Sequence, residues 1–215
     1  PIVFLSTETQ RDKQLMARSM GGDDFLVKNM DPDELVAAVT ITAERYRRLR
    51  RWMTRDSLTA LLNHTNIIEE LEQKVARAHK ESRLLSYAMV DIDYFKKVND
   101  NHGHAVGDRV IKSLSRLLRA TMDDPSAVGR YGGEEFAVIL SEQTLMRAAQ
   151  KMDELRLAFQ ALTQVDATGM HFNSSVSIGV AHLKDGMSAQ QLIDAADRAL
   201  YQAKAAGRNQ VGLAS

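Results

Sequence analysis

The stretch VGRYGGEEFAVIL, residues 128–140, places two adjacent glycines and two adjacent glutamates between apolar runs. Apolar runs on both sides of a Gly-Gly pair predict two antiparallel strands joined by a two-residue turn, in which Gly132 and Gly133 take positive φ. The second strand then begins with Glu134 and Glu135. Two carboxylates at the exit of a tight turn are either solvated or face a partner from another part of the chain.

A second acidic pair lies at the end of LLSYAMVDID, residues 84–93. Residues two apart on a strand face the same side, so Asp91 and Asp93 are predicted to project together. If the hairpin lies beside this strand, exposed acids from two elements converge, and an all-oxygen ligand set suits Mg²⁺ or Mn²⁺. The alternative is that the hairpin glutamates are merely solvated. The cost of an acid pair among apolar neighbours favours the metal site.

Basic residues that suit a triphosphate occur far along the chain. YQAKAAGRN places Lys204 and Arg208 four residues apart, on one face of a helix that ends at Gly207, and Lys96 follows the acidic strand. These side chains are predicted to hold phosphates whose other end lies on the metals. The alternative is an ordinary basic helix end that interacts favourably with the helix dipole.

The stretch KKVNDNHGHAVGD, residues 96–108, is predicted to be a loop bracketed by Asn99 and Asp108. Guanine offers N1–H and N2–H₂ donors beside its O6 acceptor, an edge that a carboxylate and an amide satisfy together. Adenine would leave the carboxylate without donors. The pair therefore favours a guanine nucleotide.

Composition excludes several classes of protein. The 215 residues include 28 Lys plus Arg, 28 Asp plus Glu and no Cys. The balanced charge predicts no nucleic-acid or membrane partner, and the lack of cysteine excludes disulfides and thiolate metal sites. The sequence has no run of about 18 apolar residues and does not begin like a signal peptide, so a cytoplasmic protein is expected.

The first part of the chain is predicted to hold two short strands, residues 1–5 and 25–27, and two helices. The second helix opens at DPDELVAAV with Asp31 as its cap. It continues over nearly three heptads, with a seam of Leu35, Val39, Thr42, Tyr46, Leu49 and Met53. The seam predicts a parallel dimeric coiled coil, and the alternative is one amphipathic helix on its own core. Six arginines between Arg45 and Arg55 are expected to form a solvated face.

From residue 56 onward, predicted helices and strands alternate. The helices are predicted at about 56–80, 107–122, 142–162 and 188–207. The strands are predicted at 84–93, 127–131, 134–140 and 172–183. This order predicts an α/β fold, an α+β sandwich of helices on a sheet.

Five motifs of this chain resemble those of GGDEF-family diguanylate cyclases in order and spacing. They are DSLTALLN (56–63), MVDIDYFKKVNDNHGHAVGD (89–108), RYGGEEFAVIL (130–140), SVSIGVA (175–181) and ADRALYQAKAAGRNQV (196–211). The resemblance covers about residues 56–212. It implies a fold like the palm of nucleotide cyclases and polymerases, with a central, mostly antiparallel sheet flanked by helices. It also implies condensation of two GTP into cyclic di-GMP with release of two pyrophosphates.

The resemblance also implies roles for individual residues. Asp91, Glu134 and the Ile92 carbonyl would bind two metal ions, Mg²⁺ or Mn²⁺, for each GTP. Glu135 would support the metal site or help activate the attacking 3′-hydroxyl. Substrate binding is implied for the phosphate contacts Lys96, Lys204 and Arg208, the guanine contacts Asn99 and Asp108, and Phe95, Gly132 and Gly133.

One departure from the family concerns product inhibition. Members inhibited by cyclic di-GMP carry an Arg-x-x-Asp motif just before the hairpin, where this chain has DDPS, residues 123–126. An aspartate in place of the arginine would repel a phosphate. We therefore expect no product inhibition through this site.

Residues 1–32 resemble the last part of a two-component receiver domain. Ser6 would match its phosphate-sensing hydroxyl, Phe25 its aromatic switch and Lys28 its phosphate-binding lysine, whereas Asn29 replaces the usual proline. The half that holds the phosphorylated aspartate is not in this sequence. An upstream histidine kinase is therefore expected only for a complete receiver, and these residues are expected to be loosely held or paired with another chain. The implied organisation is a receiver fragment (1–32), a helical stalk (33–55) and a GGDEF domain (56–215).

Three functions are compatible with these features. The leading hypothesis is a homodimeric cyclase in which the stalk brings two half-sites face to face. The alternative is a catalytically idle module that binds GTP or cyclic di-GMP and signals through the stalk. A third is a structural dimerisation protein that contacts an acidic partner through the arginines of 45–55. The complete metal set favours catalysis, whereas the missing receiver half favours an idle domain.

Overall fold

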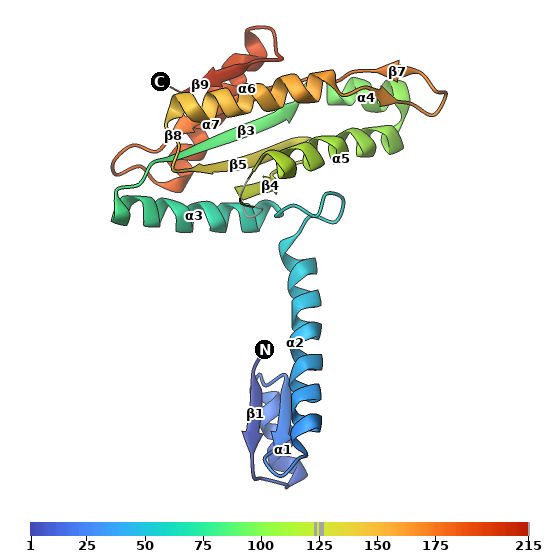
Figure 1. Ribbon diagram of the computed structural model, residues 1–215, viewed down its shortest axis with the longest axis vertical. Coiled ribbons are helices and arrows are strands. Elements are labelled where there is room, and N and C mark those ends of the chain that lie inside the picture. The colour runs from blue at the N-terminus through green and yellow to red at the C-terminus, as the bar shows by residue number, and fades with distance from the viewer. Residues whose placement is uncertain (123, 125–126, 215) are drawn as a thin grey trace. The chain divides into compact units, whose positions relative to one another are not determined.

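The computed structural model describes residues 1–122, 124 and 127–214, with only the backbone described for residues 48–53. The chain forms two compact units, Pro1–Met53 and Thr54–Ser215. The boundary falls at the end of helix α2 (Pro32–Thr54), which is labelled in Figure 1. None of the described helices is both long enough and apolar enough to cross a bilayer.

The first unit has a two-stranded parallel sheet and two helices. Strand β1 (Val3–Ser6) pairs with β2 (Asp24–Val27), and α1 (Arg11–Ser19) connects them. These elements and the start of α2 confirm the predicted order. Leu26 is the only buried hydrophobic residue among the described side chains of this unit. One buried leucine means that the unit has almost no core of its own.

Helix α2 runs unbroken for 23 residues, as its heptad pattern predicted. Two residues of the predicted seam, Val39 and Tyr46, are each 44% exposed, whereas Leu35 and Thr42 are half-buried, so the seam is only partly covered within its own unit. The side chains of Leu49 and Met53 lie outside the described residues. The coiled coil stays a prediction.

The second unit is built on a five-stranded sheet with the order β4-β5-β3-β8-β9. The strands are β3 (Leu85–Ile92), β4 (Val128–Arg130), β5 (Glu135–Ser141), β8 (Val176–His182) and β9 (Val211–Leu213). The central strand β3 pairs antiparallel with β5 and β8, and only β9 runs parallel to its neighbour. This is the mostly antiparallel sheet that was expected.

Helices cover both faces of this sheet (Figure 1). They are α3 (His64–Glu81) and α7 (Ala189–Ala205) on one face, and α5 (His104–Thr121) and α6 (Leu145–Ala161) on the other. The side chains of β3 alternate between the two cores: Tyr87 and Met89 pack with α3 and α7, whereas Ala88 and Val90 pack with α5 and α6. Asp91 has the same parity as Tyr87 and Met89, and so belongs to the face that α7 covers.

Helix α7 approaches the sheet very closely. A Cβ atom on Gly179 of β8 would collide with the backbone of Ala196 and Leu200 in α7, so this contact requires glycine. The close approach lets the C-terminal end of α7, which carries Lys204, reach the end of β3.

The predicted helix over 56–80 begins only at His64. Before it, the Asp56 carboxylate accepts hydrogen bonds from the Thr59 N–H (2.8 Å) and hydroxyl (2.7 Å), which closes a turn. Asn63 then caps the helix through a 3.1 Å hydrogen bond from the Asn66 N–H. Asp and Asn favour such local bonds over a continuing helix, and this overrides the apolar periodicity.

The prediction of a loop over 96–108 is wrong, because the stretch is helical on both sides of Gly103. Helix α4 (Phe95–His102) ends there and α5 begins, with Gly103 at φ 84° between them. A small hairpin that the sequence did not predict, β6 (Gln164–Val165) and β7 (His171–Phe172), lies beside α4 (Figure 1). His102 joins the two through a 3.0 Å contact of its Nδ1 with Asp166 Oδ2.

Candidate functional site

The acidic residues of the hairpin and of β3 meet where β3 ends. Asp91 lies opposite Glu135 in the register of β3 and β5. The next backbone N–H, that of Ile92, donates to the Glu134 carbonyl at 3.3 Å. The hairpin therefore lies beside β3, and acids from two elements converge as predicted.

Asp91 is buried and paired with a cation, whereas the sequence predicted an exposed acid. It is 7% exposed, and its Oδ2 lies 2.8 Å from Nζ of Lys204 on α7. Burial raises the pKa of Asp91 to about 6; the hydrogen bond and charge of Lys204 lower this pKa, and the charges of Glu134 and Glu135 raise it. The charges of three carboxylates thus act together where β3 ends, an arrangement that attracts a further cation.

The turn between β4 and β5 is wider than predicted, and neither glycine has positive φ. The N–H groups of Tyr131 and Gly132 both donate to the Glu135 carbonyl, at 2.8 and 3.2 Å, so Glu134 lies within the turn and β5 begins at Glu135. Gly132 has a different role: a Cβ atom there would collide with Glu135 Oε2, whereas the space around Gly133 is open. The first glycine makes room for a carboxylate of the site.

Arg130 fixes the shape of this turn. Its Nη2 and Nε donate to the Gly133 carbonyl at 2.7 and 3.2 Å, and its Nη1 lies 3.1 Å from Asp56 Oδ2. Sequence reasoning missed this role, although Arg130 stands within the RYGGEEF motif. Its acidic partner lies 74 residues earlier in the chain, and no local pattern connects the two.

Asp93 does not share the site of Asp91, so the prediction that both project together is wrong. Its carboxylate accepts hydrogen bonds from the hydroxyls of Ser175 and Ser177, both at 2.6 Å, and from the Asn209 N–H at 3.0 Å. The alternation of a strand holds only within the strand, and β3 ends at Ile92. Three donors occupy the carboxylate, and it is not presented to a metal.

The two predicted phosphate contacts near the C-terminus do not share a helix face. Helix α7 ends at Ala205, and Arg208 lies beyond it in the left-handed conformation, with φ 66°. Its Cζ lies 4.4 Å from the centre of the Tyr94 ring, and its Nη1 donates to the Tyr94 hydroxyl at 3.3 Å. Both cations still reach the end of β3, Lys204 at Asp91 and Arg208 at Tyr94.

The predicted guanine contacts lie on two helices that pack together. Asn99 is in α4 and Asp108 in α5, and a Cβ atom on Gly107 would collide with Asn99 Oδ1. Gly107 therefore lets the Asn99 amide lie beside the backbone that leads directly to Asp108. Lys96 is exposed on α4. The Phe95 ring is only 9% exposed and packs in the core, so a substrate contact is expected from its backbone.

No group of three His, Asp or Glu side chains is already arranged as a metal cluster within the described part of the chain. The donor set nevertheless fits Mg²⁺ or Mn²⁺, because Asp91, Glu134 and Glu135 offer only oxygen ligands, and the charges of the two glutamates act on Asp91 against that of Lys204. Mg²⁺ keeps several waters and takes further ligands from substrate phosphates, so the protein does not need to supply a full shell.

Known proteins resemble most of this chain. The family model described as "Diguanylate cyclase, GGDEF domain" matches residues 53–210. Diguanylate cyclase DgcP of Pseudomonas aeruginosa is 36% identical over 159 residues, which cover 74% of this chain and 24% of that protein. Response regulator PleD of Caulobacter vibrioides is 33% identical over 223 residues, which cover 98% of this chain and 49% of that protein. The chain thus spans half or less of the length of these two relatives.

Solved structures show the same fold. The coiled coil and GGDEF domain of DgcB from Caulobacter crescentus, in complex with c-di-GMP, is 30% identical, with a TM-score of 0.80, covering 94% of this chain and 100% of that one. The GGDEF domain of the same protein alone is 34% identical, with a TM-score of 0.74, covering 76% of this chain and 94% of that one. The match of most of this chain to the family model, together with this shared fold, shows that the chain belongs to the GGDEF family of diguanylate cyclase domains.

Proposed function

We propose that this chain is a diguanylate cyclase that condenses two GTP into cyclic di-GMP and two pyrophosphates. The observation that carries the proposal is the buried Asp91 carboxylate, which lies beside Glu134 and Glu135 and 2.8 Å from the Lys204 ammonium. The names of the relatives support the activity, since several are diguanylate cyclases. A domain that only bound nucleotide would not need this full set of charges.

In the reaction, the 3′-oxygen of each GTP attacks the α-phosphorus of the other. The bond to the β-phosphate breaks, pyrophosphate leaves, and the 3′-hydroxyl loses its proton, for which Glu135 is the candidate acceptor. Asp91, Glu134 and the Ile92 carbonyl would hold two Mg²⁺ or Mn²⁺ ions for each GTP. When bound, these ions supply positive charge to the triphosphate.

Substrate positioning falls to residues around the end of β3. Lys96, Lys204 and Arg208 would hold the phosphates, with the backbone of Gly132 and Gly133 and of Phe95 close to them. Asn99 and Asp108 would bind the guanine edge. Asn99 of α4 lies against Gly107 of α5, and Asp108 is the next residue of α5. An adenine base would leave the Asp108 carboxylate without donors.

Dimerisation is part of the proposal, because one domain holds only one of the two GTP molecules. Val39 and Tyr46 of the α2 seam, each 44% exposed, support a coiled coil between two copies. Two domains joined in this way would bring their GTP molecules together and convert the reaction between them into an intramolecular one.

We also propose that residues 1–32 are a receiver fragment. The Lys28 N–H donates to the Ser6 carbonyl at 2.8 Å, so the two residues lie at the same end of the small parallel sheet, while Phe25 lies on β2. The match to a protein named as a response regulator includes this region, since it covers 98% of this chain. A histidine kinase is a partner only for a chain that carries the complete receiver.

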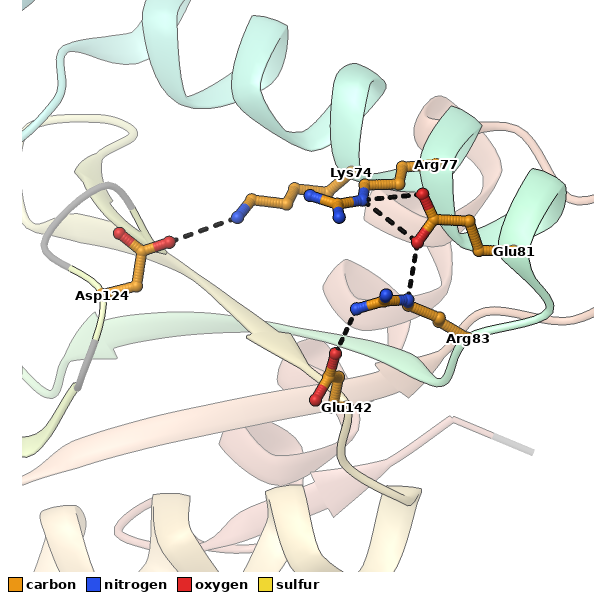
Figure 2. A network of polar contacts seen from close by, with 6 residues as sticks. All are labelled: Lys74, Arg77, Glu81, Arg83, Asp124 and Glu142. Atoms are coloured by element: carbon orange, nitrogen blue, oxygen red, sulfur yellow. Dashed lines mark hydrogen bonds and ion pairs between the residues drawn. The ribbon is translucent and has the colours of Figure 1, made fainter.

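We expect that cyclic di-GMP does not inhibit this protein through the family's Arg-x-x-Asp site. Asp123, Pro125 and Ser126 lie outside the described residues. Asp124 forms a 3.2 Å ion pair with Lys74, and Figure 2 shows further ion pairs of the same network, among them Arg83 with Glu142.

Added cyclic di-GMP should leave the initial rate at saturating GTP unchanged. Inhibition that GTP cannot relieve would contradict this expectation.

The activity is tested by incubating the purified chain with GTP and Mg²⁺ at several protein concentrations and separating the nucleotides by chromatography. We expect cyclic di-GMP, with a rate that rises faster than linearly in protein, and none from the Glu134→Gln variant. Binding of GTP without product at every concentration would instead identify the nucleotide-binding module. Failure to bind GTP at all would exclude both functions.

A further inference from the structure

Asp93 is a buried carboxylate that the proposed reaction does not use. It is 4% exposed, and its partner Ser177 is fully buried. The Ser177 hydroxyl donates to Oδ1 and the Ser175 hydroxyl to Oδ2, at 2.6 Å each, and the Asn209 N–H, which lies 116 residues away in sequence, also donates to Oδ2, at 3.0 Å. The residue therefore connects β3, β8 and the loop that follows α7.

That loop has an unusual backbone. Gly207, Arg208 and Asn209 have φ angles of 121°, 66° and 47°, which places three consecutive residues in the left-handed region. This region is unfavourable for a side chain such as arginine, so contacts outside the loop must hold the conformation. Asn209 supplies two such contacts: its N–H binds Asp93, and its Oδ1 accepts a 3.0 Å hydrogen bond from Arg156.

Tyr94, the residue that follows Asp93 in sequence, contacts the Arg208 side chain. Tyr94 is itself left-handed, with φ 55°, and is 53% exposed. Its ring lies 4.4 Å from Arg208 Cζ and 4.6 Å from Lys97 Nζ, and its hydroxyl accepts from Arg208 Nη1 at 3.3 Å. A guanidinium placed over a ring and bonded to its hydroxyl keeps few of its free rotamers.

We infer that Asp93 and Tyr94 are positioning residues that set Arg208 for an anionic ligand. Asp93 holds the backbone of the loop through Asn209, and Tyr94 holds the guanidinium. An arginine held in place before binding loses less conformational freedom when it binds phosphate, so affinity rises without any added contact. The inference rests on the proposed function only in naming the GTP triphosphate as the ligand.

The first test uses Tyr94→Ala, because the exposed ring can be removed without opening the core and alanine has the same difficulty with positive φ. The affinity for a non-hydrolysable GTP analogue with Mg²⁺ is measured by calorimetry, and we expect it to fall about three- to tenfold. Tyr201→Ala is the matched control, since Tyr201 is a tyrosine 73% exposed on α7, and its affinity should be unchanged.

The double variant tests whether Tyr94 acts through Arg208. In an Arg208→Ala background, Tyr94→Ala should cause no further loss of affinity. An equal loss in both backgrounds would mean that Tyr94 contacts the ligand itself, and would overturn the inference. If the wild type binds the analogue and Tyr94→Ala binds it with the same affinity, the inference is also overturned. If the wild type does not bind the analogue, the proposed function fails instead.

A second measurement tests Asp93 without any ligand. Hydrogen exchange of residues 207–211 should be faster in Asp93→Asn, because the half-buried Asn209 N–H loses its charged acceptor. Ser177→Ala is the control: it removes one donor to the carboxylate but keeps the bond to Asn209, so its loop should exchange at close to the wild-type rate. Unchanged exchange in Asp93→Asn would overturn the role of Asp93. So would loss of Mn²⁺ binding in that variant, because Asp93 would then be a metal ligand.

Discussion

At the scale of one residue, Asp91 combines the cost of a buried charge with an ion pair that offsets part of that cost. Its burial opposes ionisation, and the neighbouring glutamates add repulsion, so the carboxylate is charged at neutral pH only at a cost in folding free energy. Lys204 recovers part of this cost through the 2.8 Å ion pair. The residue is therefore placed for chemistry rather than for stability.

Asp91→Asn should abolish cyclic di-GMP formation and still make the metal-free fold more stable at pH 8. In the folded chain the pKa is about 6 against an ordinary value of 3.8, so the wild type bears the cost of a buried charge above pH 6 and loses it as pH falls toward 3.8. The gain in free energy of unfolding should reach at most about 3 kcal/mol and shrink at pH 5.

Thermal unfolding in the presence of a chelator at pH 5 and pH 8 measures this difference. A variant less stable than the wild type at pH 8 would show that the ion pair with Lys204 outweighs the burial of Asp91. The same pKa predicts that the affinity of the metal-free protein for Mg²⁺ falls as pH drops through about 6, because protonated Asp91 binds cations poorly, so activity at subsaturating Mg²⁺ should fall with it.

Gly132→Ala should lower activity strongly while hardly changing stability. The added Cβ collides with Glu135 Oε2, which is the far end of a flexible side chain, so the carboxylate moves and the fold does not. A misplaced catalytic group of this kind should cost at least about tenfold in rate. Gly133→Ala is the comparison, because nothing lies within 4 Å of its added Cβ: it leaves the Glu135 carboxylate in place and changes only the approach of phosphate to the turn. A Gly132→Ala variant as active as the wild type would show that the reaction does not depend on the position of the Glu135 carboxylate.

At the scale of elements, the contact between α4 and α5 would position the proposed guanine contacts Asn99 and Asp108. Alanine at position 107 should favour the helix by up to about 1 kcal/mol, yet its Cβ would push the Asn99 amide aside. We expect Gly107→Ala to raise KM for GTP severalfold and to narrow the preference for GTP over ATP. The new Cβ would also lie 3.1 Å from Phe95 Cζ, and this crowding should offset the gain in helix stability.

Gly103→Ala provides the contrast for that variant. Its added Cβ meets nothing within 4 Å, but the φ of 84° at the junction of α4 and α5 is unfavourable for alanine. It should lower the unfolding midpoint and leave the GTP preference unchanged. An unaltered preference in Gly107→Ala as well would remove Asn99 from guanine recognition.

At the scale of the whole molecule, activity should depend on association through α2. Val39→Asp places a charge in the seam and should reduce both the dimer fraction and the specific activity at low protein concentration. Ile41→Asp is the control, since Ile41 is 65% exposed and stands outside the seam. Mass in solution and rate are measured on the same samples. If both variants stay dimeric and active, α2 is not the dimer interface.

Much of the fold was accessible from the sequence because its signals are local. The alternation of helices and strands and the long run of α2 follow from apolar periodicity and from capping residues such as Asp31. The same reasoning failed where polar residues were taken for a loop at 96–108, since one glycine was enough to separate two helices there. It also failed at Gly132 and Gly133, where a two-residue turn was predicted from the Gly-Gly pair. The width of the turn is set by the hydrogen bonds from the Tyr131 and Gly132 N–H groups to the Glu135 carbonyl.

The sequence by itself determined the chemical inventory of this protein: the acids at the end of β3 and in the turn after β4, the cations near the C-terminus, and the family motifs around them. Only the tertiary structure decided the pairing of these groups. Lys204 pairs with Asp91, Arg130 joins the turn to Asp56, and Asp93 binds the loop that carries Arg208 instead of the proposed metal site. These partners lie 74 to 116 residues apart in sequence, and only the order of strands in the sheet and the close packing of α7 on Gly179 bring them within hydrogen-bond distance.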